Sequence, residues 1–455
     1  MTTADQVDAG EAAPADDIPR GVKLSWGAGA LGVAILMNAV AFLVLFYMVS
    51  ILKIEPALAG ALIFITKIFD VITDPIVGGW SDRLKTAGSR RRPFLLVGAF
   101  VAPISFAMIF TTPLFENSAF SAAYIFVVML VYTLGYTLFN VPYMSMPAEM
   151  TRNYHERSSI HGYRMVFISI GGIMAGALAP ALLEVLGRTA WSSYAFIGVG
   201  GGAVIFISMM IAWAGTGGAK YSKAAVEKQD IFKELKVVFR NRHFLRLLAV
   251  KFCQLLGAAS AQAALVFFVL NVMQLDFKAL SYYGLVIGLV SVAASPMIVR
   301  LSLIFGKHVT YIIAATCSIL VFLSWPFASP DDPLWMFLVR GGVLAVAVAG
   351  NVIMAMSMLT DIINHAAQVT GVRREGIYTA FYSFVEKFTF AFGPLIVGVA
   401  LSVAGFDENI PAEDMRTPAV RQALLLGISY IPAVMVAASI FLLSGYKLRE
   451  EDLKK

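Results

Sequence analysis

Twelve long apolar runs divide the 455-residue chain, and they restrict its possible folds more than any other feature. Each run is near or above the roughly 20 residues that an α-helix needs to cross the hydrocarbon of a bilayer. The composition agrees, because a chain that is 59% hydrophobic and 14% charged, with a mean hydropathy of +0.77, is too apolar for a soluble globular protein. The sequence therefore predicts an all-α integral membrane protein, with helices at about 24–51, 57–82, 93–113, 119–147, 159–187, 190–215, 244–272, 277–300, 306–328, 333–360, 375–404 and 418–444.

A polar connector separates the first six predicted helices from the last six. It spans 216–243 and carries seven basic residues: Lys220, Lys223, Lys228, Lys233, Lys236, Arg240 and Arg242. Two fused six-helix repeats would produce this arrangement. We expect an N-terminal half at 20–215 and a C-terminal half at 244–446, flanked by a disordered cytoplasmic tail at 1–19 and a second cytoplasmic tail at 447–455.

Lys and Arg are concentrated in alternate loops. The connector, the loop at 83–92 and the loop at 300–307 are rich in them, whereas the loops near Lys53, Arg188 and Asp331 are poor in them. Because cytoplasmic loops carry the excess of Lys and Arg, we place both termini in the cytoplasm and the protein in the cytoplasmic (inner) membrane. The same pattern explains the formal charge of +6, so we expect a lipid bilayer and no nucleic acid as a partner.

Two carboxylates lie inside the second apolar run. Asp70 and Asp74 are four residues apart, which puts both on one helix face, one turn apart. A carboxylate near the bilayer centre costs roughly 2.5 to 3.5 kcal/mol, so such residues normally mark an ion or substrate path. A bound cation or a proton would relieve their repulsion. The alternative is a structural pair neutralised by a buried cation, for which Lys67 is the local candidate.

Other polar side chains lie in or beside the apolar runs. Thr137 and Asn140 are close together on the fourth predicted helix and offer oxygens that could complete the shell of a cation or bind a polar solute; the alternative is a polar contact between helices. Lys387 lies about a third of the way into the eleventh run and needs an anionic partner, which Asp70 or Asp74 could supply. Its alternative role is a structural salt bridge. Lys251 lies nearer the start of its run, where we expect it to reach the cytoplasmic interface.

Several motifs resemble one transporter family. Gly78, Asp82-Arg83 and Arg90-Arg91-Arg92 are similar to the loop signature between the second and third helices of the major facilitator superfamily. Within that superfamily, the chain more specifically resembles the glycoside–pentoside–hexuronide:cation symporter family, which includes melibiose permease. The residues that carry this resemblance run in order from the second to the eleventh helix: Asp70-x-x-x-Asp74-Pro75, Asn140-Val141-Pro142-Tyr143, Glu149-Met150-Thr151, Glu156-Arg157, Arg164, Asp361, Thr370-Gly371-x-Arg373-Arg374-Glu375-Gly376 and Lys387.

The resemblance implies roles for these positions. It implies a major facilitator fold, a cation site at Asp70, Asp74, Thr137 and Thr73, and direct ligation by Asp70 and Asp74 if the ion is Na⁺. It implies a substrate site with Asn140, Arg164, Lys387 and Tyr143. Cytoplasmic gate contacts fall on Asp82, Arg83, Arg91, Arg157, Asp361 and Arg374. In melibiose-type members an Asp on the first helix and another on the fourth bind the sugar hydroxyls, and this chain has Ala34 and Asn140 at those positions.

We therefore expect a secondary active transporter that couples Na⁺ or H⁺ to a small solute, a sugar or glycoside, by alternating access. The runner-up is a carrier of an amphipathic solute, such as a lysolipid or a steroid-like compound, because Ala34 would give the cavity an apolar side. An intramembrane receptor or enzyme is a further alternative, but phosphate loops, zinc ligand clusters and nucleophile elbows are absent from the sequence. We expect no enzymatic activity, no cofactor beyond the coupling ion, and a monomer.

Overall fold

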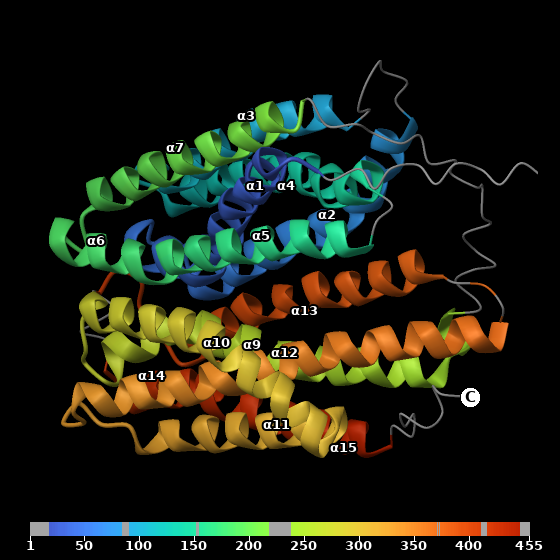
Figure 1. Cartoon of the computed structure of the whole chain (residues 1–455). Helices are drawn as coiled ribbons and strands as arrows, with labels where there is room; N and C mark the ends of the chain where they lie inside the picture. The colour runs from blue at the N-terminus through green and yellow to red at the C-terminus, as the bar shows by residue number, and fades with distance from the viewer. Residues whose placement is uncertain are drawn as a thin grey trace, which may run out of the picture.

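The structure is a computed structural model that describes residues 18–83, 91–151, 154–217, 238–370, 372, 374–410 and 416–445. All regular secondary structure in these ranges is helical, and twelve of the helices are long and apolar enough to cross a membrane (Figure 1). The predicted all-α membrane fold with about twelve crossings is confirmed. The predicted tails and most of the connector lie outside the described residues.

The first six crossings form the upper group of helices in Figure 1. The first crossing starts as a regular helix and continues through wider π-type turns, and the fifth crossing contains one such turn. The elements are α1 (Arg20–Ala39), η1 (Val40–Val44), η2 (Tyr47–Ile51), α2 (Pro56–Arg83), α3 (Arg92–Phe110), α4 (Ser118–Met150), α5 (Tyr154–Ile173), η3 (Met174–Leu178), α6 (Ala179–Leu186) and α7 (Trp191–Gly215).

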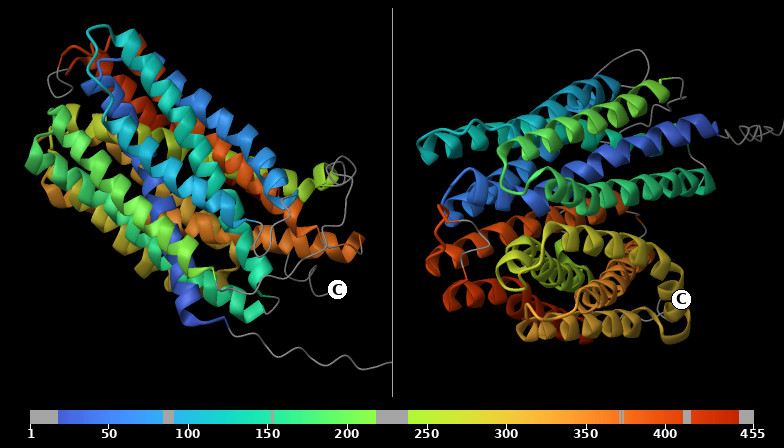
Figure 2. Two further views of the ribbon diagram at one scale, coloured as in Figure 1. Left: turned by 90° about the horizontal axis from the view of Figure 1, so that it is seen from above. Right: turned by 90° about the vertical axis from the view of Figure 1, so that its left-hand side faces the viewer.

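The last six crossings form the lower group. The same separation of the two groups is visible when the left-hand side of Figure 1 faces the viewer (Figure 2, right). The elements are α9 (Arg242–Asn271), α10 (Phe277–Phe305), α11 (Lys307–Ser324), η4 (Trp325–Phe327), α12 (Leu334–Thr370), α13 (Glu375–Val403), α14 (Pro418–Leu425), η6 (Leu426–Tyr430) and α15 (Ile431–Ser444).

The first crossing of each half ends in the same way. Lys53 follows the first and Gln274 follows the seventh, and both have a left-handed backbone with φ of 55°. The residue after each donates its N–H to a carbonyl six positions earlier, at 3.0 Å in both cases. A left-handed residue that turns the chain back onto the last helical turn is a recurrent helix C-cap. Two related six-helix repeats would carry such a cap at corresponding positions.

The two halves pack closely at the end of the bundle that the charge pattern predicts to be extracellular. There α2 runs beside α13, and α10 crosses η3 and α6. A Cβ atom on Gly284 would lie 2.0 Å from the carbonyl oxygen of Gly176, and one on Gly60 would lie 2.5 Å from that of Pro394. Only glycine permits such an approach, which is how small residues bring membrane helices together. The bundle is therefore tightly closed at this end.

Candidate cation site between the halves

Helix α2 places Asp70 and Asp74 on the side that faces α4 and α13. Both residues lie within the predicted membrane span Pro56–Ser81. Asp70 is 2% exposed, and the Asp74 side chain is 25% exposed. Pro75 follows within the same helix, and its missing N–H removes one rung of the helical hydrogen-bond ladder beside Asp74. The pair is thus largely shielded from solvent on a locally weakened helix.

Thr137 and Lys387 bind this pair from opposite sides. The Thr137 hydroxyl on α4 lies 2.9 Å from Oδ1 of Asp70 and 3.1 Å from Oδ1 of Asp74. The Lys387 ammonium on α13 lies 3.2 Å from Oδ2 of Asp70 and 2.5 Å from Oδ2 of Asp74. Each carboxylate therefore has one oxygen facing the threonine and one facing the lysine. Residues from three helices and from both halves meet at this point.

The charges of this cluster do not balance on direct contacts alone. Two ionised carboxylates and one ammonium leave a net charge of −1. Thr137 has one hydroxyl proton, so it can donate to only one of the two carboxylates at a time. The other Oδ1 atom is then free to bind a cation or a proton. The arrangement can accept one further positive charge without losing the Lys387 contacts.

Lys67 was the sequence-level candidate for a structural counter-charge. Within the described part of the chain it forms no ion pair with either aspartate, although it lies within electrostatic reach of Asp70. The direct ion pairs go to Lys387 instead, 313 residues from Asp74 in the sequence. The ion pair that the sequence predicts between Lys387 and Asp70 or Asp74 is therefore present, and it joins the two halves.

Other predicted cation-site and neighbouring side chains surround the cluster. Thr73 is buried, and its hydroxyl donates to carbonyl oxygens of its own helix, with distances of 3.0 Å to Phe69 and 3.1 Å to Asp70. Tyr136 places its ring 5.2 Å from the Lys387 ammonium, which is a cation–π distance. The Tyr136 ring therefore helps to retain the ammonium beside the carboxylates.

The predicted substrate residues fall into two kinds of environment. Oδ1 of Asn140 and Nε of Arg164 are buried atoms without a hydrogen-bond partner in the described part of the chain. Tyr143 is 0% exposed; its hydroxyl donates to the Trp26 carbonyl at 2.8 Å, and the Trp26 indole donates back to the Tyr143 carbonyl at 3.2 Å. In this conformation Tyr143 has no free surface for a solute. Asn140 and Arg164 each have a polar atom that can form a further hydrogen bond.

Ala34, which occupies the position of a sugar-binding Asp in the resembled family, is 4% exposed. A Cβ atom on Gly171 of α5 would lie 2.8 Å from its methyl group. Ala34 is thus part of the contact between α1 and α5. It does not form the apolar cavity wall that supported the amphipathic-solute alternative.

The predicted gate residues lie at the end of the bundle that we predict to be cytoplasmic. Arg91 pairs with Glu149 at 3.0 Å, and Asp361 pairs with Lys307 at 2.6 Å. The Arg374 guanidinium donates to the Thr370 hydroxyl at 2.9 Å. These contacts all remain within one half. The side chains of Asp82, Arg83 and Arg157 lie outside the described residues.

A second charged cluster was not predicted from the sequence. Lys251 is buried, and its ammonium lies 3.2 Å from Oε2 of Glu386 and 3.6 Å from the centre of the Tyr382 ring. The expectation that Lys251 reaches the membrane interface is therefore wrong. The available signal was Glu386 itself, a charged residue next to Lys387 inside an apolar run. Adjacent positions on α13 thus direct one charge to α9 and the other to α2.

Known proteins resemble this chain over nearly its whole length. The sequence profile of the family described as MFS/sugar transport protein matches residues 25–450. The uncharacterized symporter YnaJ of Bacillus subtilis is 26% identical, covering 95% of this chain and 92% of its own length. The putative glycoside/cation symporter YagG of Escherichia coli is 22% identical, covering 94% and 92%.

Solved structures show the same fold. A bacterial homologue of the human lysosomal transporter Spinster, in an inward-facing and unoccupied conformation, superimposes with a TM-score of 0.68 at 16% sequence identity, covering 93% of this chain and 95% of its own. The family profile covers far more than half of the chain. The chain therefore belongs to the MFS/sugar transport protein family, which confirms the resemblance to the glycoside–pentoside–hexuronide:cation symporters of the major facilitator superfamily.

Proposed function

We propose that this protein is a secondary active transporter that couples the inward movement of Na⁺ or H⁺ to the uptake of a sugar or glycoside. The observation that carries this proposal is the cluster of Asp70, Asp74, Thr137 and Lys387. Carboxylate and hydroxyl oxygens suit a small hard cation, and a buried pair of carboxylates equally suits a proton. The family membership and the similarity to YagG, a putative glycoside/cation symporter, support the symporter and glycoside parts.

Lys387 gives the cluster a means of coupling. Its ammonium provides a tethered positive charge beside the carboxylates and links α13 of one half to α2 of the other. A cation that binds at the free Oδ1 atom shares the carboxylate charge with this ammonium, which keeps its contacts but is held less strongly. Because a ligand shifts a conformational equilibrium only through different affinities for the two states, the strength of this link couples cation occupancy to movement of the halves.

The solute half of the mechanism is proposed for Asn140 and Arg164. An amide offers both a donor and an acceptor, and a guanidinium offers several donors in a planar array. Both side chains have a buried polar atom without a partner, which is costly unless something binds it part of the time. We propose that solute hydroxyls satisfy these atoms. Asn140→Ala is then expected to weaken solute binding while leaving cation binding in place.

The wider setting follows from the same proposal. We propose residence in the cytoplasmic membrane as a monomer, both termini in the cytoplasm, and transport without covalent chemistry. The tight contacts between halves would then lie on the extracellular side. That describes a state closed to the outside, in which the next step releases cation and solute inward.

Uptake into proteoliposomes tests this function. Purified protein is reconstituted, a Na⁺ or H⁺ gradient is imposed, and uptake of labelled methyl hexosides, pentosides and hexuronides is measured. Asp70→Asn and Asp74→Asn should insert normally and lose accumulation, while exchange down a gradient can persist. Asp331→Asn, which changes a carboxylate in a loop far from the cluster, is the matched control and should accumulate solute as the wild type does. Full accumulation by both cluster variants would contradict the proposal.

A further inference from the structure

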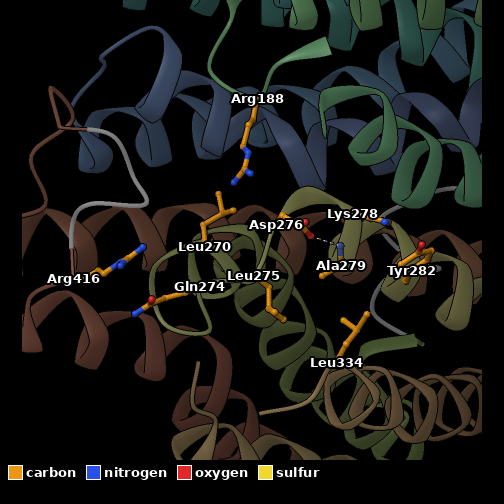
Figure 3. A pocket seen from close by; sticks show the side chains of 10 residues that line it. All are labelled: Arg188, Leu270, Gln274, Leu275, Asp276, Lys278, Ala279, Tyr282, Leu334 and Arg416. Carbon is orange, nitrogen blue, oxygen red and sulfur yellow. Dashed lines mark hydrogen bonds between the residues drawn. The ribbon is translucent and has the colours of Figure 1, made fainter. Parts of the chain in front are cut away.

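A cavity lies between the two halves at the predicted extracellular end. Its volume is about 370 Å³, near the lower end of the range for small-ligand pockets. Arg188 reaches it from the N-terminal half, whereas the other lining residues belong to the C-terminal half (Figure 3). They are Leu270, Gln274, Leu275, Asp276, Lys278, Ala279, Tyr282, Leu334 and Arg416. Both halves therefore have to be close together for this cavity to exist.

Positive charge dominates the wall of this cavity. Arg188, Lys278 and Arg416 line it, and Asp276 is the one acid among the lining residues that the structure describes. Oδ1 of Asp276 already accepts the N–H of Ala279 at the start of α10, at 2.9 Å. The described lining side chains sum to a formal charge of +2. Glu184, which lies 3.4 Å from Arg188, offsets part of it, but its other oxygen accepts the N–H of Phe277.

The gathering of these cations is unexpected for their loops. The predicted extracellular side of the chain contains few Lys and Arg residues, yet Arg188, Arg416 and Lys278, which lies in the first turn of α10, all line this one cavity. A neighbouring cavity of about 220 Å³ shares Arg188 and adds Lys53 to its wall. Like charges from opposing halves repel each other when the halves close. A bound anion would remove that repulsion.

We propose that this cavity binds an oxyanion group, such as a phosphate or a carboxylate, and that the bound anion stabilises the contact between the halves. Guanidinium groups bind such oxyanions through two parallel hydrogen bonds, and Arg188 and Arg416 supply guanidiniums from opposite halves. The phosphate can be free in solution or belong to the headgroup of an anionic lipid. This site is separate from the cation cluster, so it stands or falls independently of the transport proposal.

Thermal unfolding of the purified protein tests for the site directly. Potassium phosphate is titrated against potassium chloride at constant ionic strength, so that Na⁺ is absent and bulk salt effects are matched. The wild-type melting temperature should rise with phosphate and saturate. Arg188→Gln, Lys278→Gln and Arg416→Gln should each raise the phosphate concentration at half-saturation, by tenfold or more for the arginines. Arg421→Gln is the control, because Arg421 donates to the Pro326 carbonyl and lines neither cavity.

Lipid nanodiscs distinguish the two sources of phosphate. If a lipid headgroup occupies the cavity, phosphatidylglycerol should raise the melting temperature above that in pure phosphatidylcholine and abolish the response to added phosphate. If the ion comes from solution, both lipid compositions should give the same phosphate titration. Either result supports the site, provided that Arg188→Gln and Arg416→Gln suppress it.

Two results would overturn the proposal. One is the absence of any saturable response to phosphate or phosphatidylglycerol in the wild type. The other is an equal response in the wild type, Arg188→Gln, Arg416→Gln and Arg421→Gln, which identifies a general salt effect. The closing role has its own measurement. Ser402 near the end of α13 donates to the carboxylate of Glu55 in the other half, so its accessibility reports on closure of the halves. Phosphate should slow maleimide labelling of Ser402→Cys in a chain without Cys253 and Cys317. An unchanged labelling rate would overturn that role.

Discussion

The ammonium of Lys387 on α13 lies 2.5 Å from Oδ2 of Asp74 on α2, so the two halves of the protein share an ion pair at the candidate cation site. The Asp74 side chain is 25% exposed and that of Lys387 is 16% exposed, which limits how far water can screen the pair. A charge pair of this kind is costly to break from one side only, because the remaining charge stays buried. Cation binding and contact between the halves are thereby joined in one cluster.

Replacing Lys387 should make the protein depend on a bound cation. Lys387→Met leaves Asp70 and Asp74 facing each other without the ammonium, and loss of one partner from a buried pair typically costs about 3–5 kcal/mol. We expect a lower melting temperature in choline buffer and a larger Na⁺-induced increase than in the wild type. Lys387→Arg keeps the charge and should show a smaller change. A Na⁺-induced increase identical to that of the wild type in Lys387→Met would contradict this reading.

Thr137 is expected to contribute through its hydroxyl and not through its shape. Thr137→Val keeps the branched side chain and removes the donor that now contacts both carboxylates. The proposed site uses the Thr137 hydroxyl oxygen as a ligand of the cation, and losing a polar contact to a charged group costs about 1.5–3 kcal/mol, so cation affinity should fall by roughly ten- to a hundredfold. Isothermal calorimetry with Na⁺ measures the change. Thr137→Ser is the control and should retain most of the cation affinity. Equal cation affinities of Thr137→Val and the wild type would show that Thr137 is not part of the site.

The carboxylate pair could be predicted from the sequence because charge within an apolar run is rare and costly, whatever the fold. Its partner Lys387 could be predicted for the same reason, since an isolated ammonium at that depth needs an anion. The pair of Lys251 and Glu386 was not predicted, although Glu386 is a charged residue in an apolar run, because their contact depends on how α9 and α13 are rotated. The hydrogen bonds between Tyr143 and Trp26 depend on the same kind of rotation. Buried charges can therefore be predicted from the local sequence. The rotation of each helix about its axis cannot, because it is determined by the packing of the whole bundle.

Membrane orientation can be tested by labelling from outside. Asn409 is exposed in the loop between α13 and α14, which the charge pattern places outside the cell, and Ser222 belongs to the basic connector. Asn409→Cys should react with an impermeant maleimide in intact cells, whereas Ser222→Cys should react only after permeabilisation. The unmodified chain controls for Cys253 and Cys317. Labelling in the opposite sense would reverse the predicted orientation and, with it, the side to which the bundle is closed.

The pair of Lys251 and Glu386 should respond unequally to removal of its two members. The Lys251 side chain is 6% exposed and that of Glu386 is 46% exposed. Glu386→Gln therefore leaves a buried ammonium with the Tyr382 ring as its remaining described contact, and the cost approaches the roughly 3–5 kcal/mol of an uncompensated buried charge. Lys251→Met leaves the more exposed of the two charges without its partner, so its cost should be smaller. The double variant removes both charges and should melt close to Lys251→Met. Melting curves of the three variants in choline buffer measure this order, and equal destabilisation by the two single variants would show that burial does not control the pair.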